Sequence, residues 1–561
     1  MRIKVRVCSA NNEPIACKIL LYPVQPFGGE AAETGEKTTI YCDGVTEFER
    51  AAGDYAIEAY KGKLYTPVKA RVVLAHEDVE LEIILRAIVD TKQLGLYAFD
   101  AHSHVSRSLS SQAGNLADAA AVMKGEGFHF FFAGSPYDQH THREDLDERC
   151  EEGTSYRERF SRTIASVSDD DFVLDIGNEI VKCRYGHMFM MNYEQKPPFS
   201  RYYDRAWDPW LFTKIGEEPA YEIAYPYEAL GRERGPNSVA VAAHPTSWWW
   251  HKEQFITNIA ATLGFEILAG SIDAMVVMGY DRDHVHYQAL WYEVLNNGYF
   301  MPGVAEMDHT FDTHQTKHLA FKTYAHADEF TIDALCAAVK AGRVLASTGP
   351  IVLLRVNDQL SGAVLSYAAG ETFRIRVEAF RCCDAPLQRL QLIVNGKVWK
   401  EYSLNDDRVV LDDTLTVSCD SYIIAKCYDA AGNVAIANPV YVRNQPFANH
   451  GFQSALTVQV TKDGQPADGR FWIGKNTAKS SFSGTLDCRI HPAEDVNIEV
   501  DGEIKQVKLF ELDDLQAIFR HLYFGAFNRD RRYEAGEVPA GTFELARIRA
   551  RLSQVELQVC F

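Results

Sequence analysis

The middle of the chain alternates between short apolar runs and helix-like segments, and this alternation limits the available folds more than any other feature. The stretch 115–127 is helix-like, with Asn115 as a candidate N-cap, and the apolar run FHFFFAG (128–134) follows it directly. Later strand-like runs are FVLDIGNEI, HMFMMNY, SVAVAAHP, AMVVMGY and MPGVAEMD. Later helix-like runs are HKEQFITNIAATLG, HVHYQALWYEVLNNG and TIDALCAAVKAG. This order predicts parallel βα units over roughly residues 95–347, a length that fits a barrel of about 250 residues.

Strand-like runs without helices between them lie on both sides of this middle part. Runs such as IKVRV and CKILLYPV near the N-terminus, and TFRIRVEAF after STGP, are typical of β-sandwiches. The last segment combines strands with one helix-like run, LDDLQAIFRHLYFGAF. We therefore expect an α/β protein with a barrel flanked by all-β domains. The expected domains are an N-terminal β-sandwich at 1–92, the barrel at 93–350, a β-sandwich at 351–445 and a β-rich C-terminal domain with one helix at 446–561.

The overall charge excludes one class of partner. The 561 residues carry a net charge of −20 and no cluster of Lys and Arg, and an acidic surface repels phosphate backbones. Nucleic acid is therefore not an expected partner. No apolar run is long enough to span a membrane, and the start of the sequence lacks the apolar core of a signal peptide. We expect a cytoplasmic protein with reduced cysteines, and a secreted protein with its signal removed is the alternative.

The segment YAFDAHSHVSRS (97–108) places one carboxylate and two imidazoles at alternate positions where a strand ends. Residues two apart in a strand point to the same face, so Asp100, His102 and His104 share one side. Imidazoles placed this way can converge on one cation. The pattern is weak when taken alone, because His-x-His also occurs at 140–142 and 284–286.

Histidines and carboxylates recur at the ends of later strand-like runs. The residues are Glu179, His187, His244, Asp308 and His309. In a parallel βα barrel the carboxyl ends of the strands converge on one mouth. Packing alone does not explain ligand-type residues at five strand ends, so the sequence predicts a metal site at that mouth.

The order DAHSH, GNEI, GH, AHP and MDH resembles the polymerase and histidinol phosphatase (PHP) superfamily of metallohydrolases. The closing segment DALCAAVKAGRVLASTGP, followed by LIVNGKV, is similar to its CehA/McbA-type branch. The resemblance covers about residues 95–400 and implies a distorted (β/α)7 barrel. It also implies that a water activated by divalent metal ions attacks the substrate.

The resemblance implies a role for each matching residue. His102, His104 and Asp308 would hold the first metal ion, Glu179 would bridge two ions, and His187 and His244 would bind a further one. Asp100, Arg184 and His309 are the candidate catalytic residues.

The sequence departs from the family pattern at two places. Ser135-Pro136 stands where the family has Asp-His, and Asp308-His309-Thr310 stands where it has Asp-x-His. We therefore expect one or two ions of zinc, manganese or iron. Asp138, His140 or His142 are open alternatives for the missing pair.

Aromatic residues follow two of these strand ends and are candidates for a substrate pocket. They are Trp248 and Trp249, after the AHP motif, and Tyr280, after AMVVMG. The leading hypothesis is a metal-dependent hydrolase that cleaves a phosphoester, ester or carbamate of a small molecule. The alternative is a non-catalytic protein with a degenerate barrel that binds a glycan or another protein. The sequence is compatible with either a monomer or a homo-oligomer.

Overall fold

The computed structural model describes most of the chain. The backbone is described except at 28–29, 34–36, 106–111, 135–159, 183–185, 193–234, 236, 246–247, 252–253, 258–262, 280–283, 312–319, 449–450, 475, 477 and 516–544. Side chains are additionally not described at 25–27, 30–33, 112–115, 178–182, 186–187, 248–251, 254–257, 284–286 and 310.

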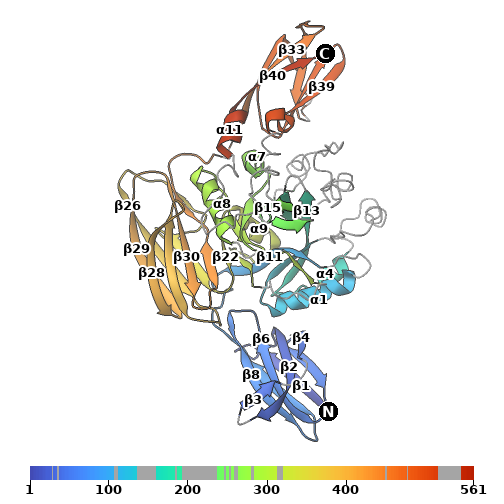
Figure 1. Cartoon of the computed structure of the whole chain (residues 1–561), viewed down its shortest axis with the longest axis vertical. Helices are drawn as coiled ribbons and strands as arrows, with labels where there is room; N and C mark the ends of the chain where they lie inside the picture. Colours follow the sequence, from blue (N-terminus) through green and yellow to red (C-terminus); the bar gives the residue numbers. More distant parts are fainter. Residues whose placement is uncertain are drawn as a thin grey trace.

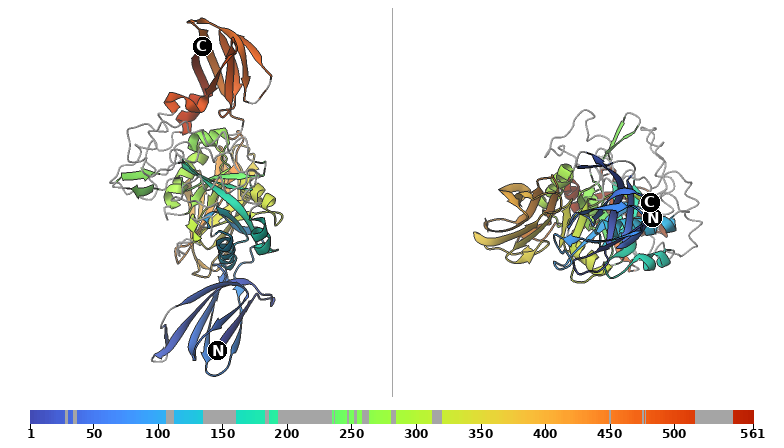
Figure 2. Two further views of the ribbon diagram at one scale, coloured as in Figure 1. Left: turned by 90° about the vertical axis from the view of Figure 1, so that its right-hand side faces the viewer. Right: turned by 90° about the horizontal axis from the view of Figure 1, so that it is seen from below.

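The described part is mostly β-structure, arranged along one long axis (Figure 1). A unit of strands at each end carries one terminus, and the helices gather in the middle. Figure 2 shows the same order of units after a quarter turn. None of the described helices combines the length and the apolar character needed to cross a lipid bilayer.

Two packed sheets form the N-terminal unit. One sheet has the order β5-β1-β9, and the other has the order β3-β2-β6-β8 with β4 also paired to β2. The strands are β1 (Arg2–Cys8), β2 (Ala16–Phe27), β3 (Glu30–Glu33), β4 (Thr38–Asp43), β5 (Val45–Glu49), β6 (Gly53–Tyr60), β8 (Val68–Leu74) and β9 (Val79–Ile84). Alternate residues of β1 and β6, among them Val5 and Ile57, meet in one apolar core. This is the sandwich arrangement that the strand-only sequence predicts.

The N-terminal unit docks on the end of helix α1 (Gln112–Gly125). The Tyr41 hydroxyl donates to Glu126 Oε1 at 2.9 Å, and Lys18 Nζ lies 3.4 Å from the same oxygen. Lys61 Nζ donates to the Lys124 carbonyl at 3.3 Å. The last carbonyls of a helix have no partner within the helix, so this lysine from another unit stabilises the α1 terminus.

The central sheet positions the candidate site. Its strand order is β19-β18-β15-β14-β13-β12-β11-β21-β22. The bounds are β11 (Leu96–His104), β12 (Phe130–Gly134), β13 (Val173–Lys182), β14 (Gly186–Met191), β15 (Val239–Ala242), β18 (Ala274–Met278), β19 (Gly303–Ala305), β21 (Lys322–His326) and β22 (Val344–Ser347). In β12, Phe131 packs on one side of the sheet while Phe130 and Phe132 pack on the other. Burial on both faces explains why these strands are continuous apolar runs.

The central sheet is mixed, whereas the sequence predicts parallel βα units. β11, β12 and β13 run parallel, and so do β15, β18 and β19. β14 is antiparallel to both of its neighbours. Only three residues separate β13 from β14, which allows a hairpin but not the crossover that parallel strands need.

Of the helices that the sequence predicts in the middle part, three are present, α1 among them, and one is not. Helix α8 (His284–Asn296) and helix α9 (Ile332–Lys340) lie where the sequence predicts them. The run from residue 251 to 264 instead contributes β17 (Gln254–Thr257), which pairs with β16 (Trp248–His251). Phe255, Ile256 and Thr257 favour a strand, and helix α7 spans Leu263–Ala269. Helix α4 (Ser161–Val167) was not predicted.

The second sandwich continues the central sheet. β22 pairs with β31, and the order runs on through β30 and β27 to β28, so one sheet crosses the expected domain boundary at residue 350. The second sheet has the order β24-β23-β26-β29. The strands are β23 (Ile351–Val356), β24 (Gln359–Leu360), β26 (Glu371–Phe380), β27 (Leu387–Val394), β28 (Lys397–Asp406), β29 (Arg408–Val417), β30 (Ser421–Asp429), β31 (Val434–Ala437) and β32 (Val440–Val442).

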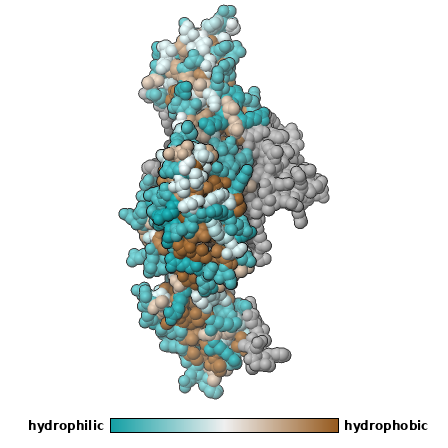
Figure 3. All heavy atoms as spheres, turned by 90° about the vertical axis from the view of Figure 1, so that its left-hand side faces the viewer, coloured by the Kyte–Doolittle hydropathy of each residue, from teal (hydrophilic) through white to brown (hydrophobic). Residues whose placement is uncertain are grey.

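The outer strands of the two sheets, β28 and β29, lie at one side of the molecule (Figure 1). Figure 3 shows apolar side chains on the face that includes this side, and Val398 and Val410 are about half exposed. Lys400 Nζ reaches Asp413 Oδ2 at 2.7 Å and so joins the two sheets at their open edge.

The C-terminal unit is a further set of strands with one described α-helix of more than one turn, α11 (Leu545–Ser553). The strand order is β34-β33-β37-β36-β35-β38-β39, with β40 also paired to β33. The strands are β33 (Ser454–Lys462), β34 (Gln465–Pro466), β35 (Asp468–Ile473), β36 (Ser480–Ser483), β37 (Thr485–Ile490), β38 (Asp495–Val500), β39 (Glu503–Lys508) and β40 (Gln554–Cys560). Most of the helix predicted from LDDLQAIFRHLYFGAF lies outside the described residues. The domain boundaries themselves stay a prediction.

Candidate metal centre

The ends of two strands that are far apart in sequence meet at the candidate site. Strand β20 (His309–Thr310) runs parallel to β11, with His309 beside Ser103. The Asp308 amide donates to the His102 carbonyl at 2.7 Å. Because this pairing joins residue 308 directly to residue 102, the carboxylate of one segment lies against the imidazoles of the other.

Three imidazoles surround the Asp308 carboxylate. Nε2 of His104 lies 3.3 Å and Nε2 of His102 lies 3.4 Å from Asp308 Oδ1, and Nε2 of His244 lies 3.7 Å from Oδ2. The imidazoles are buried, while 18% of the Asp308 side chain is exposed, so Asp308 marks the side of the site that faces solvent. Each donor comes from a strand end, as the sequence predicts.

Glu306 is a site residue that the sequence analysis did not identify. Its Oε2 lies 2.6 Å from Nδ1 of His102, and its Oε1 accepts the backbone N–H of His244 at 2.7 Å. A carboxylate can only accept, so Nδ1 of His102 carries the proton and Nε2 presents its lone pair on the Asp308 side. The signal was present in the sequence: Glu306 and Asp308 alternate in the same way as His102 and His104.

Two combinations of described residues have the composition of a metal site. The first is His102, His104 and Asp308, and the second is His102, His244 and Glu306. Within each group the ligand atoms lie within 4.8 Å of one another. Both Glu306 oxygens already accept hydrogen bonds, so its geometry is that of a carboxylate that orients a ligating histidine. The first group, with His244 added, is therefore the better fit to an ion.

The backbone at the site adopts conformations that most residues avoid. Asp308 has a φ of +45° and His244 a φ of +21°. Residues with positive φ cluster at functional sites, where the surrounding structure offsets the conformational cost. Gly279 makes room beside them, since a Cβ there would lie 2.6 Å from Cγ and 2.9 Å from the carbonyl oxygen of Glu306.

Asp100 is not a member of either donor group. Its Oδ1 accepts the Met307 N–H at 3.2 Å, which ties β11 to the segment that carries Glu306 and Asp308. Burial raises the pKa of Asp100 to about 6. The structure thus gives Asp100 a positioning contact, and its catalytic role stays a prediction.

The remaining predicted residues fall into three groups. His309 is buried against Phe311, with ring centroids 4.8 Å apart, and is not a member of either donor group. Arg184 and Tyr280 lie outside the described residues, as do Ser135, Pro136, Asp138, His140 and His142. Four further residues lie at strand positions where the side chain is not described: Glu179 in β13, His187 in β14, and Trp248 and Trp249 in β16.

The donor set fits a divalent cation that prefers nitrogen and oxygen ligands. Three neutral imidazole nitrogens and one carboxylate are typical of zinc, manganese or iron sites. Four such groups that are largely buried interact with a cation more strongly than an exposed cluster would. The fold and the site together define a mostly-β, multi-unit protein with a buried histidine and carboxylate group that can bind a metal.

No protein-family model matches the chain, and no curated protein matches it either. Among solved structures, the chain is similar to a two-domain protein of Bacteroides vulgatus that contains a predicted PHP-like metal-dependent phosphoesterase. The identity is 12% and the TM-score 0.32, with 62% of this chain and 95% of that chain covered. It is also similar to the major pilin subunit of Bacillus cereus, with 6% identity, a TM-score of 0.22, and 100% and 98% covered.

A β-glucuronidase of Bacteroides uniformis has 8% identity and a TM-score of 0.15, with 87% of this chain and 73% of that chain covered. All these TM-scores lie below 0.5, so the likenesses carry no argument about function. The chemistry has to be inferred from the residues themselves.

Proposed function

We propose that the chain is a metal-dependent hydrolase that cleaves a phosphoester, ester or carbamate bond of a small molecule. The observation that supports this proposal is the convergence of three histidine Nε2 atoms on the Asp308 carboxylate at a buried strand end. Structural metal sites close all ligand positions with protein atoms, whereas Asp308 is partly open to solvent, as a catalytic site requires.

Each described residue has a distinct task in this proposal. His102, His104, His244 and Asp308 would hold the ion, and Glu306 would keep His102 in the tautomer that presents Nε2. When bound, the ion supplies Lewis acidity: it polarises a substrate oxygen and lowers the pKa of water. Glu306 also fixes the backbone at His244, so one carboxylate orients two ligands.

The number of ions follows from how the donors are shared. Both donor groups contain His102, and its Nδ1 is occupied by the hydrogen bond to Glu306. The described residues therefore support one ion. A second ion would depend on Glu179 and His187, which sit on adjacent paired strands β13 and β14. We propose one or two ions in a distorted (β/α)7 barrel of the PHP type, with the CehA/McbA-type branch as the finer assignment.

The test measures metal content first and turnover second. Purified protein is analysed by mass spectrometry of its metals. Chelator-treated protein is then assayed with Zn²⁺, Mn²⁺ or Fe²⁺ on p-nitrophenyl phosphate, bis(p-nitrophenyl) phosphate, p-nitrophenyl acetate and a phenyl carbamate. We expect near-stoichiometric metal and turnover with at least one substrate that chelation abolishes. Metal-free protein without turnover in any arm would overturn the proposal in favour of a binding protein.

A further inference from the structure

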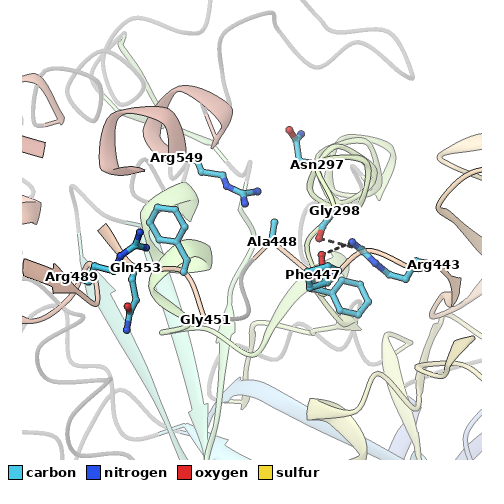
Figure 4. Close-up of a pocket in the computed structure, with 11 residues that line it drawn as sticks. Asn297, Gly298, Arg443, Phe447, Ala448, Gly451, Gln453, Arg489 and Arg549 are labelled. Carbon is cyan, nitrogen blue, oxygen red and sulfur yellow. Dashed lines mark hydrogen bonds between the residues drawn. The ribbon is translucent and has the colours of Figure 1, made fainter. Parts of the chain in front are cut away.

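A cleft lies where the central unit, the second sandwich and the C-terminal unit meet. Its volume is about 450 Å³. Asn297 and Gly298 line it from the end of α8, Arg443 from the end of β32, and Arg489 and Arg549 from β37 and α11 (Figure 4). None of these residues belongs to the candidate metal centre. The volume lies within the range of small-molecule pockets, about 300–1,000 Å³.

Apolar packing between the units holds the cleft together. Phe265 of α7 meets Phe510 of the C-terminal unit with ring centroids 5.3 Å apart. Ile548 and Leu545 of α11 pack on Gly264, where an added Cβ would lie only 2.9 Å from Ile548 Cδ1. A contact this close fixes α11 against α7, and therefore fixes the position of Arg549 relative to the central unit.

The three arginines of the cleft differ in their partners. Arg443 is tied to backbone, donating to the carbonyls of Gln445 at 2.6 Å and Pro446 at 2.8 Å, and it lies 3.8 Å from Asp420. Arg489 and Arg549 form no ion pair with any carboxylate in the part of the chain that the structure describes. Figure 4 shows these two across the cleft from Arg443.

Among the described residues, Arg549 is positioned by two aromatic rings and not by a carboxylate. Its guanidinium carbon lies 5.9 Å from the ring centroid of Tyr299 and 5.9 Å from that of Phe452. A guanidinium held by ring faces keeps its N–H donors in the plane available for a planar or tetrahedral anion.

The charge of the cleft is opposite to that of the whole protein. The chain has a net charge of −20, yet the described lining residues include three arginines and no Asp or Glu. Two positive charges that have no carboxylate partner among the described residues and share one concave site attract an anion. Phe447 and Phe452 add apolar surface to the same lining.

We propose that this cleft binds a small organic anion that carries a phosphate or carboxylate group on an apolar body. Arg489 and Arg549 provide the forked donors that phosphate and carboxylate oxygens accept, and the phenylalanines contact the apolar body. The ligand bridges the C-terminal unit and residues 443–448, so it also stabilises their mutual position. This site is independent of the hydrolase proposed above.

The probes are benzylphosphonate, which cannot be hydrolysed, and phthalate, with benzyl alcohol as the uncharged counterpart. Isothermal titration calorimetry of the full chain in chloride buffer of constant ionic strength gives the dissociation constants. We expect saturable binding of at least one anion and none of benzyl alcohol. Preference for one anion tells whether a phosphate or a carboxylate is the natural group.

Single-residue variants distinguish anion binding in this cleft from anion binding at other basic surfaces. Arg549→Gln and Arg489→Gln should each weaken binding about tenfold or more, which corresponds to about 1.4 kcal/mol. Arg547→Gln, on the same helix but outside the lining, should bind like the parent. His104→Ala should also bind like the parent, which separates the cleft from the metal centre. Absence of saturable binding up to about 10 mM, or equal affinity in parent and Arg549→Gln, would overturn the proposal.

Discussion

Nδ1 of His102 lies 2.6 Å from Oε2 of Glu306, and both side chains are almost completely buried. The two residues are 204 positions apart in sequence, and each also has a second polar partner, Asp308 for His102 and the His244 N–H for Glu306. Their contact decides which nitrogen of His102 faces Asp308. The properties of the site therefore depend on a residue that does not need to touch the ion.

The first prediction concerns this contact. Glu306→Gln removes the negative charge and allows the amide to present its N–H₂ group to His102, which favours the wrong tautomer. We expect metal affinity to fall about 10–100-fold, as is typical when a carboxylate partner of a ligating histidine is lost. A competition titration with a chromophoric chelator measures it. Glu80→Gln, whose side chain is 78% exposed, is the matched control, and unchanged affinity in Glu306→Gln would contradict the assignment.

The second prediction concerns the ligands themselves. His104→Ala removes the Nε2 atom that lies 3.3 Å from Asp308, and with it one direct donor. We expect loss of bound metal and a fall in turnover of about a hundredfold or more, equivalent to about 2.7 kcal/mol in the barrier. The β-sandwich units do not contain the site, so circular dichroism should stay unchanged. If the variant keeps both metal and rate, the site lies elsewhere. His142→Ala tests in the same assays whether His142 replaces the missing Asp-His pair.

The third prediction uses the close approach at Gly279. Gly279→Ala places a Cβ within 2.6 Å of Glu306 Cγ, so Glu306 must move. We expect a loss of unfolding free energy of about 1–3 kcal/mol from overpacking, together with weaker metal binding. Denaturant unfolding and metal titration of the same preparation test both effects. Normal metal affinity in a destabilised variant would show that Glu306 does not position the ligands.

The fourth prediction concerns pH and a histidine outside the site. Nδ1 of His129 accepts the Ala98 N–H at 2.9 Å, and burial, together with Lys61, Lys92 and Lys322, lowers the pKa of His129 from its usual 6.5 to about 3. The unfolded chain therefore takes up a proton on His129 at a higher pH than the folded chain does. The stability that this residue contributes is present above pH 6.5 and is lost as the pH falls toward 3, by at most about 1.4 kcal/mol per pH unit.

The variant His129→Gln tests this expectation. Glutamine keeps a hydrogen-bond acceptor for Ala98 but does not titrate. Melting temperatures of parent and variant between pH 7 and pH 5 should therefore diverge, with the parent losing more. Parallel curves would show that His129 takes up its proton equally in the folded and unfolded chains.

Local sequence patterns were sufficient to predict those helices and strands whose residues favour the same secondary structure that the tertiary fold requires. Helix α9 has an N-cap at Thr331 and alternates buried and exposed residues with helical spacing, so its bounds could be predicted. The sequence predicts a helix where β17 lies, because a short apolar run is compatible with a helix or a strand. The pairing of β16 with β17 decides in favour of the strand. The connection between β13 and β14 has only three residues, which is too short for the crossover that parallel strands need.

The sequence alone determined which residues have metal-binding chemistry and that His102 and His104 share a face, because strand periodicity is a local property. It also determined that the flanking segments are β-structure. Only the tertiary structure decided that β20 lies beside β11, that Glu306 orients His102, and that Asp100 accepts the Met307 N–H. The physical reason is that contacts between residues about 200 positions apart depend on how all the intervening strands pair, and no local periodicity encodes that order.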